Sequence, residues 1–425
     1  MTASLPAPET RYEAFRRDVR DLPRTAWVIY AGTFINRFGS FVLTFLVLIL
    51  VKRGYSPAEA GIAASAYGVG SVAAAMVGGQ LADRFGRRRT IALSMFSGAA
   101  VILLLWRAQA LPAIIALAAL AGMTGELYRP AAAALLADVT PAGRRVVTFA
   151  LYRLAVNAGF ALGPAVAGYL AASSFTIIFI GDAVTCALYG VLVLAAVPRS
   201  FDRPAEAPAR RREGESAARG PSALRMIAAD RALLSVLLAS VAIGFVYHQS
   251  TVTMALEVDA RGLPTSAYGF LASLNGAICL LLELPVAAVT ARAAAWIPLA
   301  VGAALTGAGF GGIALASTFW ALAAMVLVWS LGEIVQSPVS QAFVADLAPP
   351  GLQGRYQAAF GFTHALGLVL APALGPALFA WSRPGLWAIC AILGAAASLT
   401  YVALGRTRAV HTVEADLAKV AVPAE

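Results

Sequence analysis

Residues Gly78–Thr90, GGQLADRFGRRRT, place four arginines and one aspartate in a single short stretch. The apolar runs around it, residues 57–81 and 90–106, are each long enough to cross roughly 30 Å of hydrocarbon at about 1.5 Å per residue. A loop this short and charged cannot enter hydrocarbon, so it lies at a membrane surface. Because arginine collects in cytoplasmic loops, that surface is predicted to be the cytoplasmic one.

The order of residues in and before this loop is more specific than topology demands. Gly70 and Gly79 carry no side chain, so a neighbouring helix could approach closely at both. Gly86 permits a tight turn, and Asp83 could cap a helix N-terminus, where unsatisfied N–H groups favour negative charge. The arginines could pair with acids at other helix ends or with lipid phosphates. The full pattern is Gly70, Gly79, Asp83, Arg84, Gly86, Arg87 and Arg89.

This pattern resembles the loop between helices 2 and 3 of the major facilitator superfamily, with every defining position filled. The resemblance implies that Asp83 latches the N-terminal half onto the start of helix 11 when the transporter faces outward. Its partner here would be the segment Gly354 to Gln357. A purely topological interpretation explains the arginines but leaves the aspartate and the glycines unexplained.

Composition indicates an all-α integral membrane protein. Of the 425 residues, 60% are hydrophobic and 13% are charged, with a mean hydropathy of +0.77. The net charge of +10 must therefore be interpreted by location, and no nucleic-acid partner is expected. The three cysteines fall in apolar runs, and His248 and His364 have no companion ligand at a suitable spacing, so we expect no metal and no cofactor.

Twelve apolar runs follow one another along the chain. They divide it into a cytoplasmic segment (1–25) that could lie on the inner leaflet, a six-helix bundle (26–197), a cytoplasmic linker (198–231), a second bundle (232–404) and a cytoplasmic tail (405–425). The runs are 26–51, 57–81, 90–106, 111–137, 146–171, 174–197, 232–256, 265–290, 296–316, 318–344, 355–380 and 384–404.

An internal repeat supports the same architecture. A shift of 208 residues aligns Arg53-Gly54 with Arg261-Gly262, Pro130 with Pro338, and Ala137-Asp138 with Ala345-Asp346. The two sets of six helices are therefore predicted to be parallel copies related by an axis along the membrane normal.

The fifth run carries a second motif, Gly159, Gly163, Pro164 and Gly168. It resembles the GxxxGPxxGG pattern of proton-coupled drug antiporters, departing from it at Ala167. Its small residues would let this helix pack tightly on a neighbour, and Pro164 frees a backbone carbonyl. Small-residue packing is common in any helix bundle, so the motif supports an exporter without requiring one.

Charges inside the runs are the sharpest functional signal, because charged groups in hydrocarbon normally face a wet cavity or one another. The resemblance implies that helices 1, 4, 7 and 10 line the central cavity. The proton-coupling candidates are Glu126, Glu333, Arg37, Arg129 and Arg153, and the further cavity candidates are Asn36, Asn157, Tyr152 and Tyr247. Asp182 and Glu283 are expected to serve packing or gating instead.

Glu126 is our first hypothesis for the proton-carrying carboxylate. Burial would disfavour its charged form, whereas Arg129, three residues on and on the same face, would favour it. The alternative is a permanently ionised structural partner of Arg129 or Arg37. Full pH-driven efflux in a Glu126→Gln variant would move the assignment to Glu333.

The loop, the motif of the fifth run and the mid-membrane glutamate together resemble the drug:proton antiporter branch of the superfamily. The resemblance implies a secondary transporter of the bacterial inner membrane, a monomer that couples proton entry to export of a small amphipathic or cationic compound. The alternative within the fold is a dedicated exporter or flippase for one metabolite or lipid. An integral-membrane enzyme or receptor fits less well, because the sequence holds no catalytic set, Walker loop or large outer domain.

The topology is directly testable. Segments assigned to the cytoplasm, both termini included, carry 24 Lys and Arg residues, against five in the outer loops. Alkaline phosphatase fusions at Arg107 or Gly262 should therefore be active, and a fusion at Ala207 silent. The reverse pattern would overturn the topology.

Overall fold

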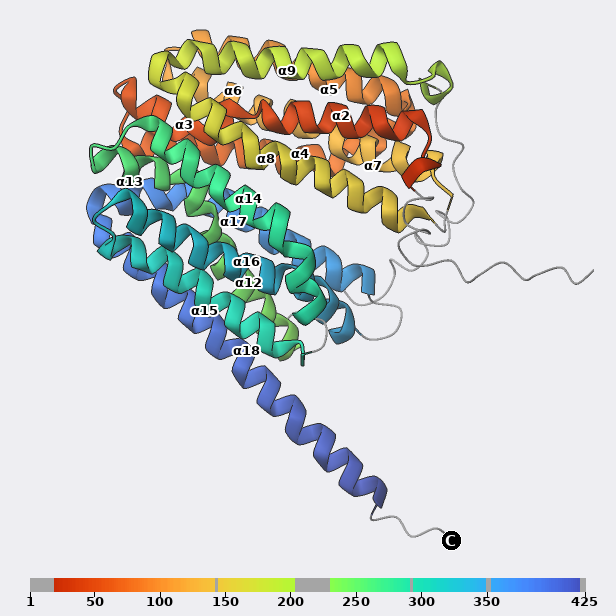
Figure 1. Cartoon of the computed structure of the whole chain (residues 1–425), viewed down its shortest axis with the longest axis vertical. Helices are drawn as coiled ribbons and strands as arrows, with labels where there is room; N and C mark the ends of the chain where they lie inside the picture. The colour runs from red at the N-terminus through yellow and green to blue at the C-terminus, as the bar shows by residue number, and fades with distance from the viewer. Residues whose placement is uncertain (1–18, 142–143, 203–229, 291–292, 349–352, 421–425) are drawn as a thin grey trace, which may run out of the picture.

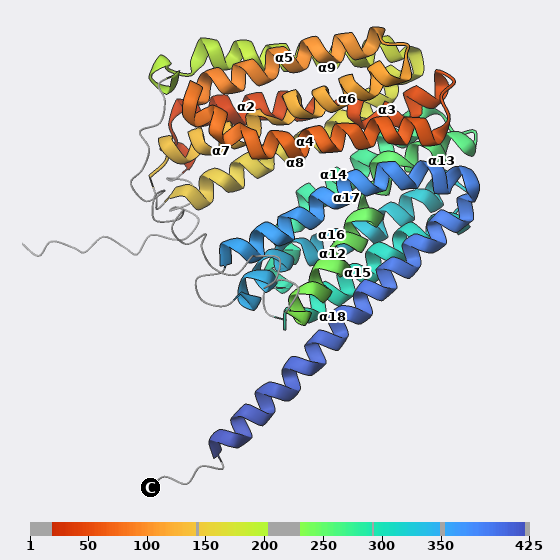
Figure 2. The ribbon, with the colours of Figure 1, turned by 180° about the vertical axis from the view of Figure 1, so that it is seen from behind.

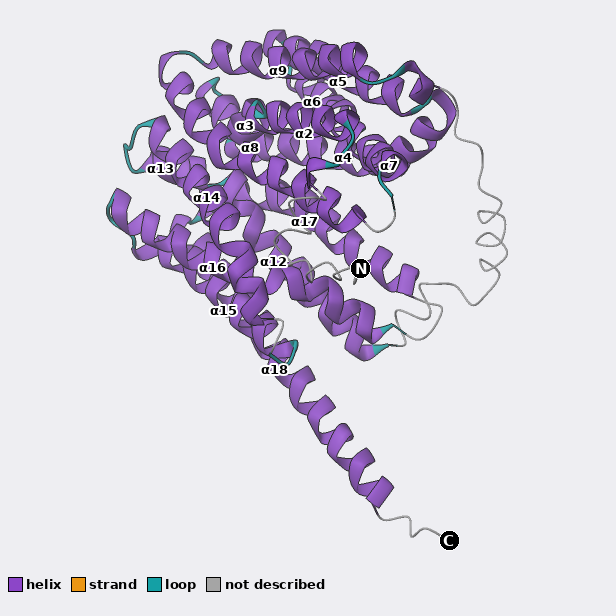
Figure 3. Ribbon diagram, turned by 45° about the vertical axis from the view of Figure 1, so that its right-hand side comes forward, coloured by secondary structure: helices purple, strands orange, loops and turns teal. Residues whose placement is uncertain are grey.

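The computed structural model describes residues 19–141, 144–202, 230–290, 293–348 and 353–420. These residues form helices joined by short loops, with no strand among them (Figure 3). Twelve helical segments are long and apolar enough to cross a membrane. The chain is therefore a multi-pass membrane protein, as predicted, with six spans in each half.

The first half contains α2 to α9, and its first and fourth spans are each made of two helices. It packs as one bundle beside the second half (Figures 1 and 2). Its elements are α2 (Arg24–Phe38), α3 (Phe41–Lys52), α4 (Pro57–Phe85), α5 (Arg87–Arg107), α6 (Leu111–Glu126), α7 (Tyr128–Val139), α8 (Arg145–Ser173), α9 (Phe175–Ala196) and the short η2 (Arg199–Asp202).

The second half contains α12 to α18. Its last helix continues well past residue 404, where the twelfth span was predicted to end, and projects beyond the bundle (Figure 1). Its elements are α12 (Arg231–Val252), α13 (Met254–Ala260), α14 (Thr265–Thr290), α15 (Trp296–Gly312), η4 (Ile313–Leu315), α16 (Phe319–Leu347), α17 (Gln353–Trp381) and α18 (Arg383–Val420).

Local chemistry explains the two broken spans. Pro130 has no N–H to bond the carbonyl four residues earlier, that of Glu126, and α6 ends at that residue. The first span breaks at Gly39 and Ser40, which leaves the first N–H groups of α3 without helical partners. Asp182 of α9 accepts the N–H of Val42 at 3.0 Å and so caps α3 from a neighbouring helix.

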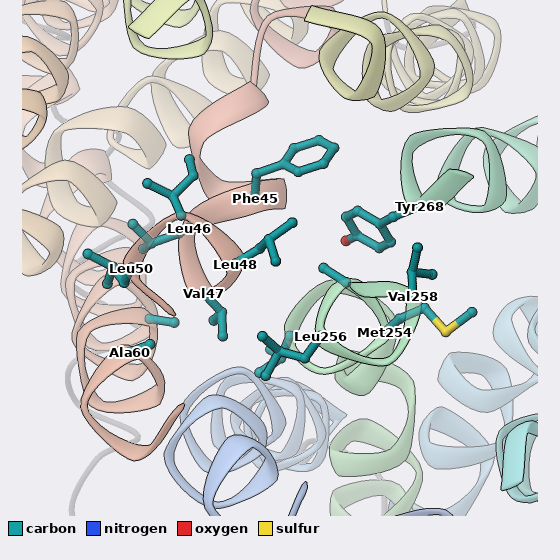
Figure 4. Close-up of a cluster of buried hydrophobic side chains, with 14 of the residues drawn as sticks. Phe45, Leu46, Val47, Leu48, Leu50, Ala60, Met254, Leu256, Val258 and Tyr268 are labelled. Carbon is teal, nitrogen blue, oxygen red and sulfur yellow. The ribbon is translucent and has the colours of Figure 1, made fainter. Parts of the chain in front are cut away.

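The two halves meet along α8 with α14 and α4 with α17. A Cβ at Gly168 would lie 3.0 Å from the Cα of Gly269, so these helices touch backbone to backbone. Apolar side chains of α3 and α13 pack together at the end of the bundle that carries α13 (Figure 4). Lys52 and Asp259 form an ion pair of 2.6 Å there. We call this the α13 end, and the opposite end, where Asp202 and Asp230 flank residues 203–229, the linker end.

Glu257 fastens α13 to α18 at the α13 end. Its side chain is 1% exposed and accepts hydrogen bonds from Arg261 at 2.6 Å, Arg383 at 2.8 Å and Trp387 at 3.0 Å. Burial alone would raise the pKa of the Glu257 carboxyl, but the hydrogen bonds from these three side chains hold it below its usual range.

We predict that Glu257→Gln lowers the apparent melting temperature at neutral pH, because hydrogen bonds to a charged acceptor contribute on the order of 2 kcal/mol. A depressed folded-state pKa gives stability that is present above the unfolded value of about 4.3 and lost as the pH falls below it. The difference between wild type and variant should therefore shrink at pH 3.5. Melting in detergent at both pH values measures this. Glu59→Gln, which affects hydrogen bonds to Ser56 within one turn, is the control and should lose less stability. A difference that persists undiminished at pH 3.5 would contradict it.

Candidate functional site

The Gly78–Thr90 loop packs against the end of the first half. Gly86 adopts φ 86°, which disfavours a side chain, and a Cβ there would lie 2.5 Å from the backbone of Phe201 and Asp202. Arg88 pairs with Asp202 at 2.7 Å and donates to the carbonyl of Leu194 at 2.6 Å. Arg89 approaches the same carboxylate at 3.7 Å. The loop therefore holds η2, which leads into residues 203–229.

The aspartate of the motif forms an ion pair within the loop. Asp83 pairs with Arg87 at 2.9 Å, and Arg87 also reaches Asp138 of α7 at 3.2 Å. Arg84 is exposed. The side chains at the start of the predicted partner segment lie outside the described residues, so the latch to Gly354–Gln357 remains a prediction.

One of the two predicted close approaches is wrong. A Cβ at Gly70 would collide with the carbonyl of Ala119 on α6, so the helices touch there as expected. At Gly79, by contrast, no described atom lies within 4 Å of a Cβ. The close approach is at Gly78 instead, where a Cβ would lie 3.0 Å from the carbonyl oxygen of Leu127 and 3.1 Å from Pro130. Gly78 faces α7, whereas the next residue points elsewhere.

The motif of the fifth span sets the position of α8 on both sides. Cβ atoms at Gly159 and Gly163 would strike the backbone of Arg37 and Phe38, where α2 ends. Gly168 lies against α14, as described above, and the carbonyl of Pro164 lies beside Gly269. The small residues therefore bring α8 against the broken first span and the second half at once.

Glu126 is held between two arginines. Arg37 makes a bidentate pair with it at 3.0 and 3.1 Å, and Arg129 donates to its Oε2 at 3.1 Å. Arg37 also donates to the hydroxyl of Tyr128 at 3.1 Å. The side chains of Arg37 and Glu126 are only 6% and 11% exposed, whereas that of Arg129 is 60% exposed. This geometry favours the ion-pair alternative for Glu126.

A cavity of about 40 Å³ lies inside the first half, beside this pair. It can hold a few water molecules. Asn36, predicted to line the cavity between the halves, instead points inward and donates to the sulfurs of Met95 at 3.7 Å and Cys186 at 3.5 Å. Tyr152 likewise packs against the apolar cluster of the first half. Helix rotation decides both outcomes, and the sequence does not fix it.

Glu333 has a different environment. It accepts hydrogen bonds from Tyr247 at 3.0 Å, Asn275 at 3.0 Å and the Cys279 thiol at 3.5 Å. Within the described part of the chain it forms no salt bridge. Asn275 and Cys279 of α14 were not predicted to belong to this site. Their spacing of four residues, which places both on one face of an apolar helix, was the only sequence signal for them.

Arg153 pairs across the interface with Glu283 of α14, to which Asn157 also donates at 3.2 Å. The arginine is 57% exposed and the glutamate 14%. Glu283 was expected only to serve packing or gating. It instead contacts two predicted site residues, Arg153 and Asn157, and so links the two halves.

His248 and His364, predicted to stand alone, lie together. The rings of His248 on α12 and His364 on α17 are 5.3 Å apart, and Nε2 of His248 is buried without a hydrogen-bond partner in the described structure. No group of three or more potential metal ligands occurs among the described residues. The pair was missed because its members lie on helices far apart in sequence.

A bundle of twelve membrane spans in two six-helix halves, with charged side chains on the helices between them, is typical of secondary transporters. The chain belongs to the Major Facilitator Superfamily, whose family model matches residues 29–372 and 249–424. The family predicted from the Gly78–Thr90 loop is thereby confirmed.

Similar proteins are transporters with different substrates. A Na(+), Li(+), K(+)/H(+) antiporter of Planococcus maritimus is 27% identical over 410 residues, or 90% of this chain and 95% of the relative. Multidrug resistance protein MdtH of Aeromonas hydrophila is 26% identical, covering 81% of this chain and 84% of the relative. A POT family transporter solved with a thioalcohol-conjugated peptide shares the fold, with a TM-score of 0.75 at 14% identity over 92% of this chain and 99% of that chain.

We predict that Glu126→Gln lowers stability strongly, because Arg37 is then left buried without its bidentate partner. Removing one member of a buried pair costs about 3–5 kcal/mol. The apparent melting temperature of the purified variant measures this, and Arg37→Gln with Glu126→Gln in one chain should recover part of the loss. If the single variant melts like wild type, the pair does not carry this role.

Proposed function

We propose that the protein is a proton-coupled exporter of small amphipathic compounds that works by alternating access. In this proposal it is a monomer of the bacterial inner membrane with both termini in the cytoplasm. The observation that carries it is the environment of Glu333, a carboxylate within a membrane span whose described hydrogen-bond donors are all neutral.

A coupling carboxylate must be able to gain and lose a proton during the transport cycle. Glu126 is poorly suited, because Arg37 and Arg129 hold its charge from two sides. Glu333 has no such counter-ion among the residues that the structure describes, and the donors around it can remain hydrogen-bonded to a neutral acid after modest rotation. We therefore assign the proton to Glu333 and a structural role to Glu126.

Coupling to the movement of the halves has a physical basis. Arg153 of the first half pairs with Glu283, which lies one helical turn from Cys279, a hydrogen-bond donor to Glu333. A motion that separates the halves at this level takes that positive charge away from the carboxylate. Proton binding and the relative position of the halves are then linked, as exchange of protons for substrate requires.

The relatives support this class of activity without fixing the substrate. One is an antiporter of alkali cations with protons, and another is a multidrug resistance protein, each similar over most of the chain. A dedicated metabolite or lipid exporter of the same fold remains the second candidate. A substrate screen in proteoliposomes with an imposed pH gradient separates these activities and includes Na⁺, Li⁺ and K⁺ as one arm.

We predict that Glu333→Gln abolishes pH-driven uphill efflux while leaving substrate exchange down its own gradient. Glutamine keeps the size and hydrogen bonds of the side chain but cannot titrate. Glu59→Gln, in the capping box at the start of α4, is the matched control and should retain pH-driven efflux.

Proteoliposome flux with and without a protonophore measures both activities. Full pH-driven efflux in the Glu333→Gln variant would refute the assignment. Loss of efflux together with exchange in this variant, with normal melting, would assign Glu333 to substrate binding instead.

A further inference from the structure

The basic and acidic members of the Arg129–Glu126 and Arg153–Glu283 pairs differ sharply in exposure. Arg129 and Arg153 are more than half exposed, whereas their partners Glu126 and Glu283 are largely buried. Both arginines lie within membrane spans, where an exposed charge is costly unless it faces water or a ligand. What these pairs present outward is therefore guanidinium and not carboxylate.

Both arginines lie near α8. Arg153 is on α8 and reaches Glu283 of α14 in the second half. Arg129 shares Glu126 with Arg37, whose guanidinium lies against Phe160 of α8. Helices α7 and α8 thus bring two exposed guanidinium groups close to the contact of α8 with the second half. Glu333 of the second half is covered by its own described hydrogen-bond donors.

Resting on the proposed function, we infer that Arg129 and Arg153 bind the anionic group, a carboxylate, sulfonate or phosphate, of an amphipathic substrate. The planar guanidinium fork matches such oxyanions. Because Arg37 holds Glu126 by two hydrogen bonds of its own, Arg129 can turn to a ligand without leaving that carboxylate uncompensated.

An apolar surface lies beside the arginines for the rest of the substrate. Phe160 is partly exposed, two helical turns beyond Arg153 on the same face of α8. Its ring lies 5.7 Å from the guanidinium carbon of Arg37, and its backbone lies beside Gly276 of α14, which places it toward the second half. A cationic substrate would instead have to displace an arginine from a buried carboxylate, which is unfavourable.

The charge of the substrate also determines the energetics. Export of a monovalent anion in exchange for one proton moves negative charge out and positive charge in, so an inside-negative potential drives both movements. Exchange of a monovalent cation for one proton would be electroneutral. Dependence on membrane potential therefore distinguishes the two substrate classes.

The test compares three probes that share one ring system and differ in charge: 2-naphthylacetate, 2-naphthylacetamide and 2-naphthylethylamine. Their binding to the purified full chain in detergent at pH 7.5 is measured by equilibrium dialysis. We expect the carboxylate to bind about tenfold tighter than the amide, the gain of a charge-assisted hydrogen bond, and the amine to bind weakest.

Arg129→Gln and Arg153→Gln should each lower the ratio of the affinity for the carboxylate to the affinity for the amide several-fold. The corresponding lysine variants should retain part of this preference. The control is Arg107→Gln, in which the lost arginine lies over the ring of Trp106 away from the interface. A structural role alone would lower the affinity for all three probes equally, and that result would overturn the inference. Tightest binding of the amine, or no binding of the carboxylate at millimolar concentration, would overturn it too.

An anionic lipid could supply the same chemistry as a soluble organic anion. A competition experiment therefore adds lysophosphatidylglycerol. If this lipid displaces 2-naphthylacetate much more strongly than it displaces the amide, the ligand is a lipid head group.

In proteoliposomes, 2-naphthylacetate efflux should accelerate when valinomycin and K⁺ make the interior negative. If the protein prefers the amine but Glu333→Gln still abolishes pH-driven efflux, the proposed exporter is supported and the anion site is refuted. If the protein prefers the carboxylate but Glu333→Gln keeps pH-driven efflux, proton coupling at Glu333 is refuted and the anion site is supported.

Discussion

The ion pair between Arg37 and Glu126 is the constraint on which the first half depends. Each residue lies in the last turn of a helix that stops in mid-span, α2 or α6. Two charges in hydrocarbon are tolerated only as a pair, so the two broken spans must stay in contact. Pro130 creates one break, and the Asp182 cap stabilises the restart after the other.

Sequence patterns that act locally predicted most of the fold. Span number follows from the length of apolar runs, because hydrocarbon thickness is fixed. The positive φ of Gly86 and the contacts at Gly70, Gly159, Gly163 and Gly168 follow from spacing along one helix or turn. The family, too, could be inferred from these motifs, which lie in single short segments.

Pairings between distant helices could not be predicted in the same way. Which face a helix presents depends on its rotation and tilt, and an error of one residue turns a side chain by about 100°. Asn36 therefore turned out to face Met95 and Cys186, and Gly78 replaced Gly79 at the close approach. The contact between His248 and His364 and the donors around Glu333 depend on the same unknown rotations.

That sensitivity accounts for the difference between the two mid-span glutamates. The repeat shift of 208 residues carries Glu126 to Ile334, which is buried, so the glutamate of the second half stands one position earlier. The offset of about 100° turns Glu333 toward Tyr247 and Asn275, whereas Glu126 faces Arg37. The same helical scaffold thus holds one carboxylate between cations and the other among neutral donors. A single-residue offset thus gives the carboxylates of two equivalent spans different partners, and the proposed proton coupling at Glu333 rests on that difference.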